Sequence, residues 1–198
     1  MALPSFDTCI RLMTAAGEIM LGRKPALGKL DLSADGFYDS FFALIVALPP
    51  MLLSWVTIAR RGDLAGETGI TVTGMVARLA FIDVALWLLP LFAFIAVARF
   101  LGLTDRIIAY VAASNWASAL IVWLTVPLTL LDLLVAQNAA LDALQFMVFI
   151  AILVLSFRLT VVTLNRPLPL SGGVFAASLV FSIVLLMLMR DMLGLAPS

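Results

Sequence analysis

The chain has 198 residues, of which 64% are hydrophobic and only 12% are charged. Soluble domains carry about 25% charged residues and the mean hydropathy here is +1.16, so a water-soluble enzyme is excluded. The 12 basic and 12 acidic residues cancel, which gives no electrostatic reason to expect nucleic acid as a partner. The chain lacks histidine and has one cysteine, Cys9. This excludes an internal disulfide, a zinc site built from Cys and His, and a His-dependent triad.

The N-terminal segment, residues 1–36, is predicted to be cytoplasmic and to contain an amphipathic helix over residues 6–21. One face is predicted to hold Phe6, Cys9, Ile10, Met13, Ala16, Gly17, Met20 and Leu21. The other face holds Asp7, Arg11, Thr14 and Glu18. Such a helix is expected to lie along the inner membrane surface or to pack beneath a bundle. We expect a turn at Asp35–Gly36, just before the first span.

Five apolar segments follow, and each is long enough to cross about 30 Å of hydrocarbon as a helix. They are predicted at about 40–59, 76–98, 107–135, 141–164 and 174–193, within a transmembrane domain of residues 37–198. A helix satisfies its backbone hydrogen bonds internally, and no alternating strand pattern is present. The predicted fold is therefore an all-α integral membrane five-helix bundle preceded by an amphipathic interfacial helix.

The distribution of Lys and Arg favours a cytoplasmic N-terminus and a periplasmic C-terminus. The eight basic residues on the predicted inner side are Arg11, Arg23, Lys24, Lys29, Arg99, Arg106, Arg158 and Arg166. The four on the outer side are Arg60, Arg61, Arg78 and Arg190. The Arg60–Arg61 pair is the main observation against this orientation.

Polar residues within membrane spans are costly, and they are therefore candidate functional sites. At the rise of a helix, Asn115 lies roughly 12 Å and Arg158 roughly 9 Å from the inner ends of their spans. We expect both residues to share one polar layer with Ser114, Ser118 and Ser156. In one interpretation this layer binds a lipid headgroup or an anionic substrate through Arg158. We favour the other, in which Arg158 reaches the interface and Asn115 bonds a neighbouring helix.

Asp83 is the second candidate, about seven residues into the second predicted span from its outer side. An ion pair with Arg78 or Arg190 would neutralise its charge and hold helices together. The alternative is a proton-binding carboxylate, because burial disfavours the charged form of an aspartate. We favour the ion pair, since a coupling site usually has more polar neighbours.

Prolines occur near the middle of the first three predicted spans, at positions 49, 50, 90 and 127. Each removes a helical hydrogen bond and is expected to kink its span, as in transporters whose broken helices bind substrate. The four tryptophans are expected mainly to fill packing space. Signatures of serine hydrolases and of phosphate-binding loops are absent. We therefore predict no catalytic residues, no metal site and no cofactor.

Three short stretches carry a resemblance to known membrane proteins. They are GRKP at 22–25, DGFYDSFF at 35–42 and YVAASNW at 110–116. Together with the five-span layout, they resemble the Yip1-domain membrane proteins, and more specifically a set of small uncharacterised alphaproteobacterial inner-membrane proteins distantly similar to that family. The resemblance implies a trafficking or membrane-organising factor without catalytic residues.

The sequence thus predicts a non-catalytic polytopic protein of the bacterial inner membrane, either a membrane-organising factor or an accessory subunit of a larger membrane complex. Its expected contacts are the lipid bilayer and a protein partner or a second copy. The alternative is a small transporter or channel subunit that uses the kinked spans one to three, with Asp83 as an ion or proton site. Five spans cannot form two equal repeats, the layout of many transporters, which favours the first hypothesis.

Overall fold

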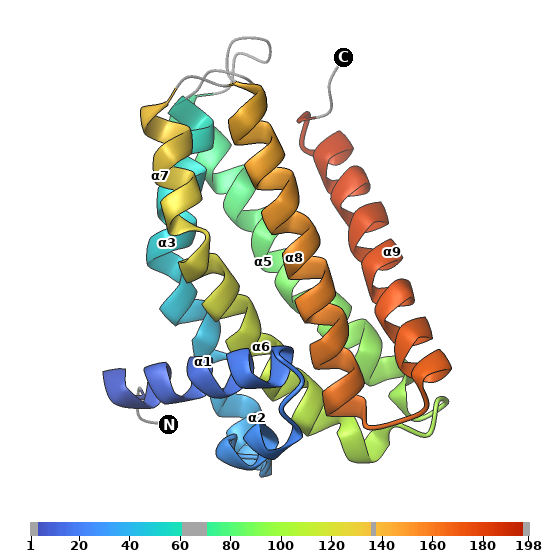
Figure 1. The fold of residues 1–198 in the computed structure, drawn as a ribbon. Helices are drawn as coiled ribbons and strands as arrows, with labels where there is room; N and C mark the ends of the chain where they lie inside the picture. The colour runs from blue at the N-terminus through green and yellow to red at the C-terminus, as the bar shows by residue number, and fades with distance from the viewer. Residues whose placement is uncertain (1–3, 61–70, 136–137, 196–198) are drawn as a thin grey trace.

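The computed structural model describes residues 4–60, 71–135 and 138–195. These residues form helices and no strand. The stretches that are long and apolar enough to cross a membrane are Ala34–Arg60, Val72–Ala98, Thr104–Leu134, Ala139–Leu164 and Leu168–Met192. They stand side by side as one bundle (Figure 1), which confirms the predicted all-α fold with five helices able to span a membrane.

All five stretches begin earlier than the predicted spans. Their α-helices are α2 (Ala34–Asp39), α3 (Phe42–Arg60), α5 (Val72–Ala98), α6 (Ile107–Leu124), α7 (Val126–Leu134), α8 (Ala139–Leu164) and α9 (Leu168–Met192). Capping explains two of these starts: the Thr71 side chain accepts from Gly74 N–H, and the Asn138 side chain accepts from Ala140 and Leu141 N–H. Positions 61–70 and 136–137 of the predicted links lie outside the described residues.

Pro127 marks the division of the third span into two helices. Helix α6 ends at Leu124, and α7 begins at Val126 with Pro127 in its first turn. Proline fits there because the first N–H groups of a helix have no intrahelical acceptor. The short helix η2 (Thr104–Arg106) precedes α6.

Pro50 lies inside α3 and creates a connection to another helix. Because proline has no N–H, the carbonyl of Val46 loses its usual donor. The indole Nε1 of Trp123 in α6 donates to that carbonyl at 3.0 Å. The hydrogen bond that Pro50 removes from α3 is therefore replaced by one that joins α3 to α6.

Helix α1 (Phe6–Met20) lies across one end of the bundle, and the end of α9 lies at the opposite end (Figure 1). Helix α1 packs against α6 and α8. Its buried residues are Cys9, Ala15, Ala16, Ile19 and Met20. Phe6, Ile10 and Leu21 of the predicted apolar face are exposed instead. Cys9, Ala16 and Met20 of the predicted face are buried, and Ala15 and Ile19 are buried beside them, so the buried face is rotated from the predicted one.

The turn predicted at Asp35–Gly36 is wrong, because both residues lie in the first turns of α2. Ser33 caps this helix, and its Oγ accepts from Gly36 N–H at 3.1 Å. Gly36 is buried, and a Cβ there would lie 2.2 Å from the carbonyl oxygen of Asp31. Glycine is needed at this position for close backbone packing rather than for a turn.

Candidate functional site

The structure separates the two main residues of the predicted polar layer. Asn115 is fully buried in α6, whereas Arg158 is exposed on α8. The Arg158 guanidinium donates to the carbonyl of Leu21 at the C-terminal end of α1. Carbonyls at a helix C-terminus carry partial negative charge and lack intrahelical donors. Arg158 and Asn115 therefore do not form one site: Arg158 fixes α1 to α8, and Asn115 bonds neighbouring helices, as the favoured interpretation expects.

Asn115 is the centre of a hydrogen-bond network that joins three parts of the bundle. Its Oδ1 accepts from Trp87 Nε1 of α5 at 2.9 Å. Its Nδ2 donates to Ser40 Oγ, at the junction of α2 and α3, at 2.9 Å. Ser40 in turn donates to the Phe37 carbonyl at 2.7 Å. Because these partners belong to the protein itself, Asn115 holds neighbouring helices together rather than binding a ligand.

The three predicted serines, Ser114, Ser118 and Ser156, line one cavity of about 260 Å³ between α5, α6, α8 and α9. We call it the hydroxyl cavity. Its further hydroxyl groups belong to Tyr110, Thr160, Ser178 and Ser182. The Tyr110 hydroxyl interacts with Ser114, Thr160 and Ser178. The described residues that line this cavity carry no charge, so its chemistry suits a neutral hydrogen-bonding guest.

Asp83 lies in the interior of α5, eleven residues after Val72, or roughly 16 Å along the helix axis. It is deeper than the sequence suggested, because α5 begins at Val72 rather than at residue 76. Its Oδ2 accepts a hydrogen bond from Trp55 Nε1 of α3 at 2.6 Å. The partner of this carboxylate is thus a neutral indole.

The predicted ion pair between Asp83 and an arginine is not formed. Arg78 donates to the carbonyl of Leu193. Arg190 donates from Nε and Nη2 to the carbonyl of Leu195, at 3.4 and 3.3 Å. Within the described ranges, no Lys or Arg pairs with Asp83. Both arginines instead satisfy carbonyls after the last turn of α9.

A second cavity, of about 350 Å³, has Asp83 in its wall, and we call it the Asp83 cavity. Its hydroxyl-bearing residues are Ser54, Ser118, Thr125 and Thr129. It shares Leu86, Trp87, Ser118 and Ile121 with the hydroxyl cavity, so the two meet along α5 and α6. Pro90 leaves the carbonyl of Leu86, a residue that lines both cavities, without its usual helical donor.

Indole N–H groups connect the helices around these cavities, which sequence reasoning missed when it treated tryptophan as packing material. The three bonds run from Trp55 to Asp83, from Trp87 to Asn115 and from Trp123 to the Val46 carbonyl. They link α3 to α5, α5 to α6 and α6 back to α3, and we call them the three indole bonds. The available signal was a tryptophan and a polar or proline residue on each of these spans.

No group of three or more His, Cys, Asp or Glu that could hold a metal ion occurs in the part of the chain that the structure describes. Comparisons with protein-family models, with curated proteins and with solved structures found no match. The resemblance to the Yip1-domain proteins therefore stays a prediction.

Proposed function

We propose that the chain is a non-catalytic, multi-pass inner-membrane protein that works as a small transporter or channel subunit, with Asp83 as its ion or proton site. The supporting observation is the environment of Asp83. The carboxylate is half-buried, lines a cavity between α3, α5, α6 and α7 and, among the described residues, is bonded to an indole rather than to a basic side chain. An ionised carboxylate within a membrane is costly without an opposite charge. A proton or a bound cation would supply it.

The polar neighbours of Asp83 also favour this function. Four hydroxyl-bearing residues share its cavity, and Ser118 and Trp87 connect it to the hydroxyl cavity. A water molecule takes about 30 Å³ in the liquid, so each cavity has room for several. Hydroxyl groups and water can replace part of the hydration of a cation, or relay a proton.

Replacement of Asp83 by asparagine tests the proposal in vesicles that contain the full-length protein. The amide oxygen still accepts from Trp55, so the fold should persist, while the negative charge is lost. We expect proton or monovalent-cation flux to fall at least about tenfold, since a contact to a charged group contributes roughly 1.5–3 kcal/mol. Flux is measured with a pH-sensitive or ion-sensitive dye inside the vesicles.

Asp191→Asn is the matched control, because Asp191 is an exposed carboxylate in the last turn of α9. Its flux should equal that of the wild type. Wild-type vesicles that leak no faster than empty vesicles, or an Asp83→Asn variant with normal flux, would contradict the proposal.

We infer a cytoplasmic N-terminus and a periplasmic C-terminus from the eight-to-four distribution of basic residues. Of these residues, Arg61 lies outside the described ranges. Alkaline phosphatase is active only after export, so a fusion after Ser198 should be active. A fusion after Gly102, in the link between α5 and η2, should be inactive. The reverse pattern would invert the orientation.

The second candidate is a membrane-organising factor or an accessory subunit, and the exposure of α9 favours it. Only Ser171 and Val174 of this helix are buried. Its exposed large apolar residues are Leu168, Val180, Phe181, Ile183, Val184, Met187, Leu188 and Met192. Lipid, a partner subunit or a second copy would cover them. Native mass spectrometry of gently extracted protein distinguishes these: a stoichiometric companion supports the second candidate, and its absence favours transport.

A further inference from the structure

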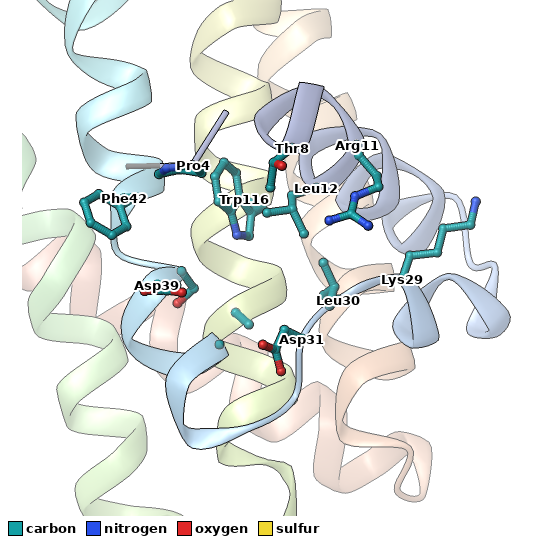
Figure 2. A pocket seen from close by; sticks show the side chains of 13 residues that line it. Pro4, Thr8, Arg11, Leu12, Lys29, Leu30, Asp31, Asp39, Phe42 and Trp116 are labelled. Atoms are coloured by element: carbon teal, nitrogen blue, oxygen red, sulfur yellow. The ribbon is translucent and has the colours of Figure 1, made fainter. Parts of the chain in front are cut away.

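A third cavity, of about 340 Å³, lies where α1 crosses the end of the bundle (Figure 2). We call it the N-terminal cavity. Its charged lining residues are Arg11, Lys29, Asp31 and Asp39, from α1, α2 and the segment between them. Sequence reasoning assigned none of these residues to a site, and none of them lines the Asp83 cavity or the hydroxyl cavity.

The charged groups of this cavity differ in whether they already have partners. Lys29 forms an ion pair with Glu18 at 2.6 Å. Arg11 and Asp39 each form no ion pair and no side-chain hydrogen bond within residues 4–60, 71–135 and 138–195. Figure 2 shows them on different sides of the cavity, Arg11 from α1 and Asp39 from α2. One guanidinium and one carboxylate thus line the same cavity without contacting each other.

Asp31 adds a second carboxylate. Its Oδ1 accepts from Ser33 N–H at 2.9 Å. Hydrogen bonds from Ser33 lower the pKa of Asp31, which keeps it ionised at neutral pH. A purely anionic guest would meet two carboxylates, and a purely cationic guest would meet Arg11. A guest that carries both charges at opposite ends would satisfy both sides.

We propose that the N-terminal cavity binds a zwitterionic group with a phosphate or carboxylate at one end and a primary ammonium at the other. Arg11 would hold the anionic end through charge-assisted hydrogen bonds, and Asp31 and Asp39 would hold the ammonium. Cavities of about 300–1,000 Å³ are typical for small-molecule sites. The site is separate from Asp83 and does not depend on transport.

The position of the cavity favours a phospholipid headgroup as the source of this group. Arg11, Lys29 and Asp31 precede the first membrane-spanning stretch, which begins at Ala34. Phe42 and Trp116 line the same cavity from α3 and α6, which belong to membrane-spanning stretches. Asp39 lies near the start of that stretch, in α2. Charged groups before and at the start of the first span, with aromatic groups of the spans beside them, match an amphiphile such as phosphatidylethanolamine. A free zwitterion of the same chemistry is the other source.

Native mass spectrometry of the full-length protein, titrated with phosphatidylethanolamine or phosphatidylglycerol of identical acyl chains, tests the proposal. Phosphatidylglycerol lacks the ammonium group. We expect phosphatidylethanolamine to bind at least about tenfold more tightly than phosphatidylglycerol. Arg11→Gln or Asp39→Asn should each weaken the binding of phosphatidylethanolamine about tenfold. The controls Arg23→Gln and Asp35→Asn make the same charge changes at exposed positions outside the cavity, and should bind normally.

Measurable and equal binding of the two lipids by the wild type would overturn the proposal without any variant, and so would a failure of both lipids and phosphoethanolamine to bind. Normal phosphatidylethanolamine binding by both cavity variants would also overturn it, provided that their circular dichroism and elution volume match the wild type. Phosphoethanolamine provides the other arm. If it binds and the lipid does not, with the same sensitivity to Arg11→Gln, the zwitterion site stands and the lipid source is wrong.

Discussion

Replacement of Asn115 by leucine is expected to lower the free energy of unfolding by about 2–3 kcal/mol, the cost of leaving a buried donor without an acceptor. The Trp87 N–H loses its acceptor, and the Ser40 Oγ loses the hydrogen bond that Asn115 Nδ2 donates to it. Interhelical hydrogen bonds in membranes average only about 0.6 kcal/mol. The larger value applies here because Asn115 is fully buried and leucine offers no substitute. Reversible unfolding in mixed detergent micelles measures the change.

A double-mutant cycle with Trp87→Phe provides the control. Phenylalanine removes the indole donor, so the penalty for an unsatisfied N–H disappears in the double variant. The two substitutions together should therefore destabilise the protein by clearly less than the sum of the single effects. Additive effects would show that the Trp87–Asn115 bond contributes nothing.

Gly36→Ala is expected to destabilise the protein by about 3 kcal/mol, at the upper end of the usual cost of overpacking. The added Cβ would lie 2.2 Å from the Asp31 carbonyl oxygen and 2.6 Å from its Cγ. The backbone at Asp31 cannot move aside as a flexible side chain could, so α2 must shift. The thermal midpoint of the protein in detergent should fall by several degrees.

Gly28→Ala is the matched control, because nothing lies within 4 Å of a Cβ built at Gly28. Exposed substitutions of this kind change stability by less than about 0.5 kcal/mol. A Gly36→Ala variant that melts with the control would contradict the close packing between α2 and Asp31.

The spans could be predicted because length and hydropathy are local properties of the sequence. The starts of α5 and α8 were placed too late because their caps, Thr71 and Asn138, lie in polar links that hydropathy does not resolve. The Asp35–Gly36 pair was misread because glycine serves both turns and close packing. Ser33, three residues before Gly36, is the local signal for a helix start.

The rotation of a helix about its axis could not be predicted from the sequence. Asn115 and Arg158 have similar predicted depths, yet Asn115 faces α5 and the α2–α3 junction while Arg158 faces α1. Ser114 and Ser118 were brought together as expected for positions four apart on one helix face. The partner of Asp83 depended on how α3 and α5 pack, which a single sequence does not reveal.

The three indole bonds bear on the order in which the helices of the protein pack together during synthesis. Domains and their parts fold from the N-terminus as the chain emerges. These bonds need no residue after Trp123, because their acceptors at Val46, Asp83 and Asn115 all precede Trp123 in the chain. The first three spans can therefore close on one another before α8 and α9 have been made. The last two helices are then added to a framework that already exists.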